Sequence, residues 1–345
     1  MSTAASALPP EASAAQLGFQ IAWGYVGSSA LHAALELGLP DRLAAGPKPV
    51  AELARETGTN EDALYRVLRV LASLGMFEEQ AARTFAANLP AQLLRAQPGT
   101  ARDILYFLTE PNHFKIHADL LHTLRTGQPA VEKVMGKPVF EVFASDPAFG
   151  KVFNDAMTSM SALAIPAALE VFDFGDIRVL VDVAGGHGRV LTSILRQYPN
   201  MRGVLFDQEH VIAGAASLIA DSGVADRCTT VSGDFFSAVP GGGDAYIMKH
   251  IIHDWDDDRS LTILGNIHRM LAGVANGRVI LLESVVQPGN VPDFAKLIDM
   301  EMLLIPGGRE RTADEFASLF ARAGFELTRV VPTASPLSVI EAVAR

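Results

Sequence analysis

Residues 179–188 hold the feature that most constrains the fold. The apolar run Val179-Leu-Val-Asp-Val183 is followed at once by Ala-Gly-Gly-His-Gly188. Glycines directly after a strand let the backbone approach a ligand at the N-terminus of the next helix. The segment therefore predicts a strand, a tight turn and a helix, with a ligand site at the turn.

The chain after this turn alternates between apolar strands and helical stretches. That alternation is typical of a doubly wound parallel sheet, so we expect an α/β fold of the Rossmann-like kind. The expected parallel strands are 179–183, 202–207, 228–232, 245–248 and 278–283, and two closing strands are expected at 325–331 and 337–343.

The N-terminal region predicts a winged helix-turn-helix. Helices are expected at 50–58 and 60–75, with wing strands at 76–79 and 84–86. Asn60 is a good N-cap, and Gly75 suits the position after the last turn. Arg66 and Arg69 could face DNA, but residues 1–100 hold nine acidic and seven basic side chains. Because DNA readers carry a basic surface, we favour contact with a second subunit.

Length and charge narrow the class of protein. The 345 residues predict more than one domain. We expect a winged-helix dimerisation domain at 1–100, a helical linker at 101–170 that contributes to a substrate pocket, and the catalytic sheet domain at 171–345. The linker is rich in aromatic and methionine side chains, which suit core packing or a pocket for an aromatic ligand.

The excess of acidic residues and the single cysteine exclude several kinds of binding partner and site. A net charge of −11 opposes binding to nucleic acid or to anionic membranes. Cys228 alone can form neither an internal disulfide nor a cysteine-based zinc site. Residues 1–16 lack the features of a signal peptide, and no apolar run approaches the roughly 20 residues of a spanning helix. We expect a cytoplasmic protein.

Three acids at successive strand ends select the ligand of the glycine turn. A dinucleotide fingerprint would need glycine at position 191, which is Leu191. Asp182 would repel a pyrophosphate, whereas S-adenosylmethionine carries a sulfonium and an ammonium cation. Asp207 can accept hydrogen bonds from ribose hydroxyls, and Asp234 from an adenine amino group whose ring Phe235 covers. S-adenosylmethionine is therefore the expected cofactor.

With these motifs the chain resembles the S-adenosylmethionine-dependent O-methyltransferases of the plant caffeate and flavonoid type, which include bacterial secondary-metabolite enzymes. The resemblance covers nearly the whole chain. It rests on 180–188, Asp207, Gly233-Asp-Phe-Phe236, Met248-Lys-His-Ile-Ile-His-Asp-Trp255 and Gly307-Gly-Arg-Glu-Arg-Thr312. Ala184 stands where the family usually has glycine. Because the contact there is mainly through backbone, alanine is tolerable if its φ is negative.

The resemblance implies the residues of the site and a homodimer formed through the N-terminal domain. The acceptor would be a small aromatic molecule with a hydroxyl group. Phe153, Asn154, Met157, Met300 and Met302 would contact it, although core packing is an alternative for the methionines. The implied cofactor residues are Asp182, Ala184, Gly185, Gly186, Gly188, Asp207, Gln208, Gly233, Asp234, Phe235, Phe236, Lys249 and His250.

His253 is the expected general base. It follows the strand at 245–248, on the side where doubly wound sheets bind ligands. A phenol has a pKa of about 10, so an imidazole with a pKa of about 6.5 can assist its deprotonation. By resemblance Glu283 and Glu310 flank His253, and Asp254 lies near the active site.

Two features leave other functions open. The run 254–258 is acidic, but a calcium loop starting there would need glycine and glutamate where Arg259 and Gly265 stand, so we expect no metal. Some relatives bind the cofactor and catalyse hydroxylation or decarboxylation, and a ligand-responsive winged-helix regulator is a further alternative.

Overall fold

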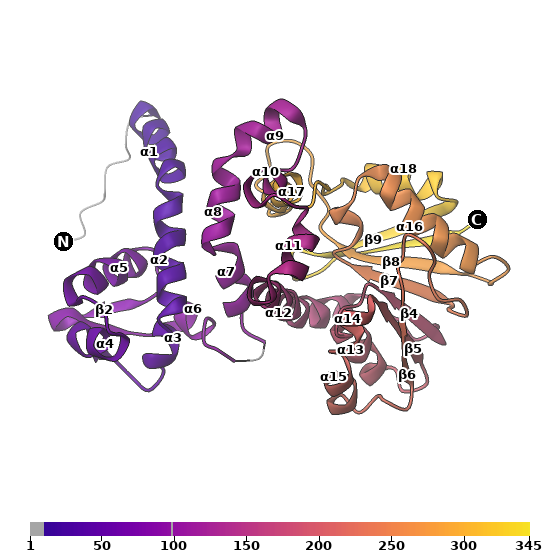
Figure 1. The fold of residues 1–345 in the computed structure, drawn as a ribbon, viewed down its shortest axis with the longest axis horizontal. Coiled ribbons are helices and arrows are strands. Elements are labelled where there is room, and N and C mark those ends of the chain that lie inside the picture. Colours follow the sequence, from indigo (N-terminus) through magenta and orange to yellow (C-terminus); the bar gives the residue numbers. More distant parts are fainter. Residues whose placement is uncertain (1–9, 98) are drawn as a thin grey trace. The chain divides into compact units, whose positions relative to one another are not determined.

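A computed structural model of the chain describes residues 10–97 and 99–345. The contacts divide it into two compact units, one ending at His113 and the other starting at Phe114, and each unit is described by itself. The first unit therefore takes in residues 101–113 of the expected linker, and the second unit contains the rest of it. Figure 1 labels the elements.

The first unit is mostly helical. Its helices are α1 (Pro10–Ala22), α2 (Gly24–Glu36), α3 (Leu39–Arg42), α4 (Val50–Thr57), α5 (Glu61–Ser73), α6 (Leu89–Gln92) and α7 (Arg102–Leu108), with the short 3-10 helix η1 (Ala81–Arg83). Its strands are β1 (Lys48–Pro49), β2 (Glu78–Gln80) and β3 (Thr84–Ala86). Helix α8 (Pro111–Ala118) crosses the boundary between the units.

The winged helix-turn-helix is confirmed in this unit. Asn60 Oδ1 accepts a hydrogen bond from the Ala63 N–H at 2.9 Å and so caps α5, and Gly75 follows α5 with a φ of 85°. Strands β2 and β3 pair antiparallel, and β1 adds a third strand beside β3 that the sequence did not indicate. Leu53, Leu68 and Phe85 are completely buried between helices and sheet.

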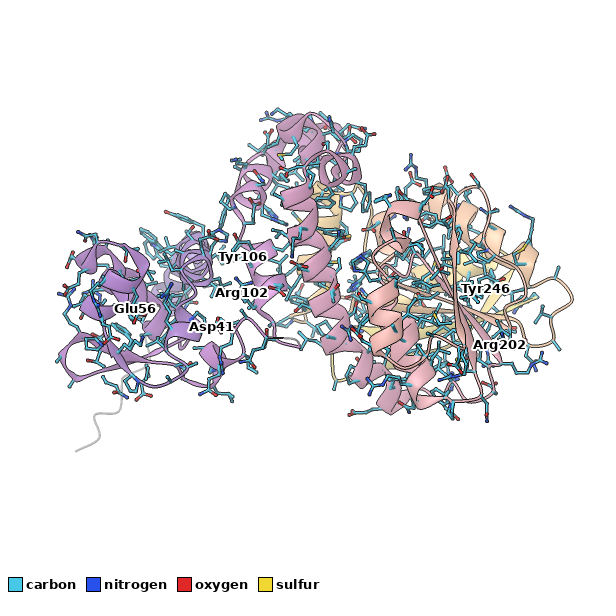
Figure 2. All side chains as sticks on the ribbon, turned by 60° about the horizontal axis from the view of Figure 1, so that its bottom comes forward. Asp41, Glu56, Arg102, Tyr106, Arg202 and Tyr246 are labelled. Carbon is cyan, nitrogen blue, oxygen red and sulfur yellow. The ribbon has the colours of Figure 1, made fainter. Side chains whose placement is uncertain are left out.

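A polar contact joins α7 to α2 within the first unit. The hydroxyl of Tyr106, labelled in Figure 2, donates to Glu36 Oε2 at 2.6 Å. This carboxylate raises the pKa of Tyr106 to about 12. The His32 ring lies over Tyr106 with 4.8 Å between centroids. Helix α7 thus packs with the first unit, which explains why the boundary lies beyond residue 100.

The second unit begins with helices and continues as an α/β sheet. The leading helices are α9 (Leu120–Thr126), α10 (Ala130–Met135), α11 (Val139–Ser145) and α12 (Pro147–Val171). The strands are β4 (Val179–Val183), β5 (Arg202–Asp207), β6 (Cys228–Ser232), β7 (Ala245–Lys249), β8 (Arg278–Glu283), β9 (Phe325–Pro332) and β10 (Ser338–Ala344). The intervening helices are α13 (Arg189–Gln197), α14 (Glu209–Ile212), α15 (Ala216–Asp221), η2 (Ile252–Asp254), α16 (Asp257–Met270), α17 (Ala295–Leu304) and α18 (Ala313–Arg322).

All seven expected strands form one sheet in the order β6-β5-β4-β7-β8-β10-β9. Strands β4 to β8 are parallel, while β9 and β10 are antiparallel to their neighbours. The expected α/β class and the two closing strands are therefore confirmed. Because parallel strands end at one edge, Asp182, Asp207, Lys249 and Glu283 are brought to the same edge of the sheet.

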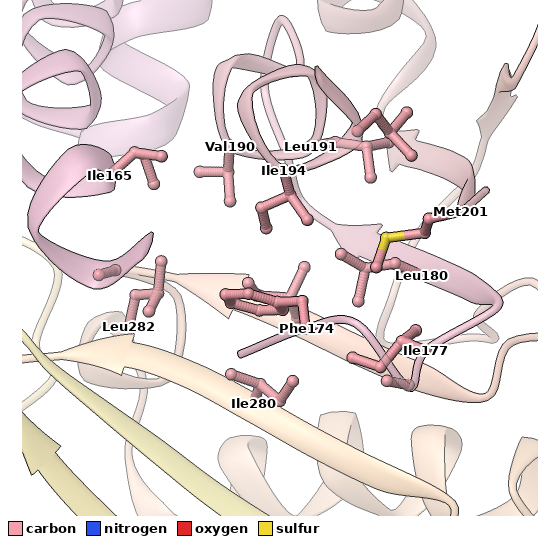
Figure 3. Packing of buried hydrophobic residues seen from close by; sticks show 14 of the residues in the cluster. Ile165, Phe174, Ile177, Leu180, Val190, Leu191, Ile194, Met201, Ile280 and Leu282 are labelled. Carbon is pink, nitrogen blue, oxygen red and sulfur yellow. The ribbon is translucent and has the colours of Figure 1, made fainter. Parts of the chain in front are cut away.

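The strands are apolar on both faces because helices cover both faces. Leu180, Ile280 and Leu282 face one core cluster, in which they meet Ile165 of α12 and Ile194 of α13 (Figure 3). The alternate strand residues, including Val181 and Met248, face a second cluster with α16 and α18. Such burial, at about 25 cal/mol per Å² of apolar surface, fixes the strand ends that position the site.

None of the helices in the described residues is both long and apolar enough to cross a membrane.

Candidate active site

The glycine turn joins β4 to α13 through a tightly packed backbone. Gly186 and Gly188 have φ values of 60° and 85°, a region that glycine enters without strain. A Cβ on Gly185 would lie 2.6 Å from the Asp182 carboxyl carbon and 2.5 Å from a Leu205 methyl group. Glycine is required at 185 because the buried carboxylate lies directly beneath the turn.

Ala184 does not meet the condition under which alanine would be tolerated without strain. That condition was a negative φ, but the structure gives a φ of 55°. In this left-handed region the Cβ of an L-residue crowds the next carbonyl oxygen, at a cost of about 1–2 kcal/mol. The turn geometry, which the family usually builds with glycine, is retained, and the alanine adopts it.

Asp182 is buried and incompletely hydrogen-bonded. Its residue is 1% exposed, and its Oδ2 has no hydrogen-bond partner among the described residues. Burial raises the pKa of Asp182 to about 7. An ionised buried carboxylate without a partner is costly, so a cationic ligand bound at the turn would favour the ionised form of Asp182.

Asp207 and Gly233 bring the ends of β5 and β6 to the turn. Asp207 Oδ2 accepts from the Gly186 N–H at 2.8 Å, and Oδ1 accepts from the Gln208 N–H at 2.7 Å. The Gly233 N–H donates to the Asp207 carbonyl oxygen at 3.0 Å. Burial raises the pKa of Asp207. An open hollow beside these residues is lined by Gln208, Glu209, His210, Ser232, Gly233 and Asp234.

Phe235 and Phe236 come directly after Asp234 in the chain, and both contact Trp255. The Phe235 and Phe236 rings meet edge to face with centroids 4.7 Å apart, and Trp255 contacts Phe236 at 4.8 Å. Asp234 Oδ1 accepts from the Phe236 N–H at 2.9 Å, which holds the turn closed. The Asn266 amide donates to the carbonyl oxygens of both phenylalanines, a support that the sequence did not reveal.

These residues fit S-adenosylmethionine. The unpaired Asp182 oxygen suits its cationic end, the glycine backbone leaves room for close approach, and the Asp207 carboxylate lies where ribose hydroxyls can donate. The hollow beside Asp234 has aromatic neighbours of the kind that adenine needs.

His253 lies in η2, directly beyond the end of β7, and the predicted carboxylates surround it. Its Nδ1 lies 2.7 Å from Glu310 Oε1 and 3.6 Å from Glu283 Oε2. Its Nε2 lies 3.5 Å from Asp254 Oδ1. Glu283 Oε1 accepts the backbone N–H groups of Ile251 and Ile252, each at 3.0 Å. Four predicted catalytic residues from three chain segments therefore meet at one place.

Burial shifts the proton affinity of the surrounding groups. It raises the pKa of Glu310 to about 8 and that of Asp254 to about 7, and it raises the pKa of Glu283. It lowers the pKa of Lys249 to about 8 and that of His250 well below its usual value. Groups perturbed this strongly and gathered in one place are typical of a catalytic site.

Lys249 is the last residue of β7, and His250 follows it just before the short helix η2 that carries His253. Lys249 Nζ is 3.2 Å from His250 Nδ1, and the His250 ring stacks on His253 with centroids 4.8 Å apart and planes 5° apart. His250 also has a positive φ of 54°. Backbone strain of this kind persists where surrounding structure fixes it, often at functional sites.

His250, His253 and Glu283 offer ligand atoms within 4.8 Å of one another. A histidine nitrogen binds a metal through a lone pair in its ring plane. The two histidine rings are parallel, with centroids 4.8 Å apart. That no metal takes part stays a prediction.

Sequence reasoning missed the residues that fasten the Gly-Gly loop to this site. Asp299 of α17 accepts from the Glu310 N–H at 2.8 Å, and the Arg309 N–H donates to the His253 carbonyl oxygen at 2.8 Å. A Cβ on Gly308 would lie 2.7 Å from the Asp254 carbonyl oxygen. The paired glycines in the motif were the available signal, because they permit this close backbone contact.

The predicted acceptor residues lie on α12 and α17. Phe153 stacks on Phe143 with centroids 4.3 Å apart, whereas Asn154 is exposed and Met157 is half-buried. Met300 packs against the cluster around Leu304 and Ile305, which agrees with the core alternative for this side chain. Met302 is half-buried, and its carbonyl oxygen accepts from the Gly307 N–H. Their contact with an acceptor stays a prediction.

Comparison with known proteins places this site in a class. Residues 117–326 match the family model of the O-methyltransferase domain, and residues 19–97 match that of the O-methyltransferase dimerisation domain. Phenazine O-methyltransferase PhzM of Lysobacter antibioticus is 41% identical, with 94% of each chain covered. Aclacinomycin 10-hydroxylase RdmB of Streptomyces purpurascens is 34% identical, with 86% of this chain and 81% of that protein covered.

A solved structure agrees over the whole chain. The SAH-bound form of CalO1, a methyltransferase in calicheamicin biosynthesis, has a TM-score of 0.87 and 34% identity, with 98% of this chain and all of that chain covered. The fold and site thus define an S-adenosylmethionine-dependent methyltransferase. The chain belongs to the O-methyltransferase family whose catalytic and dimerisation domains it contains.

Proposed function

We propose that this enzyme methylates a phenolic hydroxyl of a small aromatic molecule, with His253 as general base. The distance of 2.7 Å between His253 Nδ1 and Glu310 Oε1 carries the proposal. A proton on Nδ1 then bonds to the carboxylate, which leaves Nε2 with a lone pair for the substrate proton. A third group that orients a base in this way is common in enzymes.

The proposed reaction transfers one proton from the acceptor to His253 and one methyl group from the cofactor to the acceptor. The acceptor O–H bond breaks as its proton moves to His253 Nε2, and the phenolate oxygen forms a bond to the methyl carbon. S-adenosylmethionine, when bound, would supply that methyl group from its cationic sulfur, which would leave with the electron pair of the carbon–sulfur bond as the uncharged sulfur of S-adenosylhomocysteine. Glu310 and Glu283 stabilise the imidazolium that forms.

Aromatic side chains near His253 support an aromatic acceptor. Phe140 stacks on Trp255 at 5.8 Å, and Phe143 lies between Phe149 and Phe153 in the same part of the second unit. Planar rings bind well against such surfaces. The named acceptors of its relatives, phenazines among them, are aromatic as well, and the intact His253 pairing favours methyl transfer over the hydroxylation named for RdmB.

The first unit is proposed to form the homodimer. Its N-terminal helices expose Leu17, Phe19, Ile21 and Trp23, with more than half of each residue accessible. Large apolar side chains gathered on one short segment suggest an interface. The match to a dimerisation domain supports the same assignment.

A methylation assay on wild type, His253→Ala and His122→Ala tests the base. We expect His253→Ala to lose about 10²–10⁴-fold in kcat on a phenol panel read by mass spectrometry. His122 on α9 is a control outside the site, so His122→Ala should retain activity. Calorimetry with S-adenosylmethionine shows whether each variant keeps its cofactor site. Full activity of His253→Ala would refute the base assignment.

A further inference from the structure

Arg311 is a buried cation whose contacts reach the catalytic segment. It is 1% exposed, and it lies one residue after Glu310. Its Nη1 donates to the Ile252 carbonyl oxygen at 3.1 Å, and its Nη2 donates to the Trp255 carbonyl oxygen at 3.1 Å. Nη2 also donates to Asp257 Oδ1 at 2.9 Å, which supplies the countercharge.

These contacts hold the backbone on both sides of His253. Ile252 precedes His253, and Trp255 follows it by two residues. A planar guanidinium offers five donors in a fixed arrangement, so one side chain can hold several acceptors at once. The two carbonyl groups are fixed relative to each other, and η2 between them is fixed with them.

The backbone of Arg311 is itself anchored to the sheet. Val285 and Arg311 form an isolated parallel bridge, and the Val286 N–H donates to the Arg311 carbonyl oxygen at 3.0 Å. Glu310 is therefore held next to a fixed residue, just beyond the end of β8. One residue thus links the segment that carries His253 to the segment that carries Glu310.

We propose that Arg311 is a positioning residue that sets the hydrogen bond between His253 Nδ1 and Glu310 Oε1. The proposal rests on the proposed role of His253 as the base. Loss of the guanidinium would leave the carbonyl groups of Ile252 and Trp255 with longer contacts only, from Ser260 Oγ at 3.4 Å and, for Ile252, from the Trp255 N–H at 3.3 Å. The His253 ring would then move relative to Glu310. A misplacement of about 1 Å costs about 10²-fold in rate.

Arg322 provides a matched control. Its Nη1 donates to Asp257 Oδ2 at 2.9 Å, so it shares the counterion of Arg311. Its side chain is 46% exposed, and among the described residues it forms ion pairs only with Asp257 and Asp258. Arg322→Met removes an arginine from the same carboxylate without removing a donor to the η2 carbonyl groups.

The test compares Arg311→Met, Arg311→Lys and Arg322→Met. We expect both Arg311 variants to lose about 10²-fold in kcat with little change in KM or in S-adenosylmethionine affinity. Lysine keeps the buried charge, but it is a point donor that cannot bridge two carbonyl groups. Arg322→Met should stay within about threefold of wild type. Added guanidinium should restore part of the activity of Arg311→Met.

A second readout reports the position of His253 without relying on catalysis. The hydrogen-bonded Nδ1–H proton gives a low-field proton NMR resonance, assigned by its loss in His253→Ala. We expect this resonance to shift upfield or disappear in both Arg311 variants and to persist in Arg322→Met. If His253→Ala were fully active, the base assignment would fail, yet this resonance would still test the positioning role.

Two outcomes would overturn the proposal. The first is a folded Arg311→Met or Arg311→Lys enzyme with the kcat and the Nδ1–H resonance of Arg322→Met. The second is failure of both Arg311 variants to fold, since Arg311 would then support the whole unit rather than the His253 bond.

Discussion

Two groups of acids lie at the same edge of the sheet, and Asp207 of one group and Glu310 of the other are held in different ways. Near the glycine turn, both Asp207 oxygens accept backbone N–H groups from neighbouring strand ends and turns. Near His253, Glu310 Oε1 faces a ring nitrogen from a distant segment, and its Oε2 has no partner among the described residues. Asp207 is thus held by backbone N–H groups, whereas Glu310 is joined to His253 by a side-chain contact between distant segments.

This difference predicts where a single substitution has a large effect. A carboxylate held by backbone groups remains in place when its neighbours change. A side-chain pair depends on both partners and on the loops that carry them. We therefore expect the largest effects on rate around His253, and smaller effects on cofactor affinity or stability around the turn.

The largest expected effect separates Glu310 from Glu283. Glu310→Gln removes the charge that stabilises the imidazolium at 2.7 Å, so we expect kcat to fall by about 10²-fold. Glu283→Gln should cost less, because Glu283 lies 3.6 Å from Nδ1 and the amide oxygen can still accept from Ile251 and Ile252. Steady-state kinetics on both variants give the ratio of their kcat values. A larger loss in Glu283→Gln would make Glu283 the main partner of His253.

A smaller effect is expected at Asp182, where protein stability and affinity for S-adenosylmethionine should both depend on pH. The folded-state pKa is about 7 against a usual 3.8, so the folded protein holds a proton there that the unfolded chain releases. Stability of the ligand-free protein should therefore fall as pH rises from about 4 to 7. A cationic cofactor favours the ionised form, so affinity for S-adenosylmethionine should rise over the upper part of this range.

Asp182→Asn tests this sign directly. We expect about a tenfold loss of affinity at pH 7.5, a smaller loss at pH 5.5, and higher stability of the ligand-free protein at pH 7.5 because no charge is buried. Calorimetry in two buffers should show proton release on binding to wild type that the variant lacks. Asp207→Asn is the comparison, and proton release equal in both variants would contradict the role of Asp182.

The sequence predicted the parts of the molecule that depend on local pattern. Apolar runs bounded by glycine or acidic residues indicated all seven strands of the large sheet. Asn60 and Gly75 marked the two ends of α5 correctly. The clustering of Glu283 and Glu310 on His253 came from resemblance, since no local signal joins residues so far apart. Strand β1 was missed because two residues carry no periodicity.

Backbone geometry and loop support were the least predictable features. The positive φ of His250 has no signal in its residue type, and the role of Asp299 depends on how α17 meets the Gly-Gly loop. At Ala184 the residue type favours a negative φ, but the turn imposes a left-handed backbone. Tertiary constraint outweighs local preference at these positions.

The smallest expected effect is at Ala184. Ala184→Gly should relieve the strain of a φ of 55° and raise the free energy of unfolding by about 1 kcal/mol, since the steric relief exceeds the added freedom of the unfolded chain. Ala82→Gly is the matched control, because Ala82 has a φ of 56° in the first unit. Denaturant melts should show stabilisation in both variants.

Only Ala184→Gly should also alter S-adenosylmethionine affinity, by less than tenfold, because only its backbone belongs to the turn beneath the cofactor. Destabilisation by Ala184→Gly alone would mean that the Ala184 methyl group makes contacts worth more than the strain it causes.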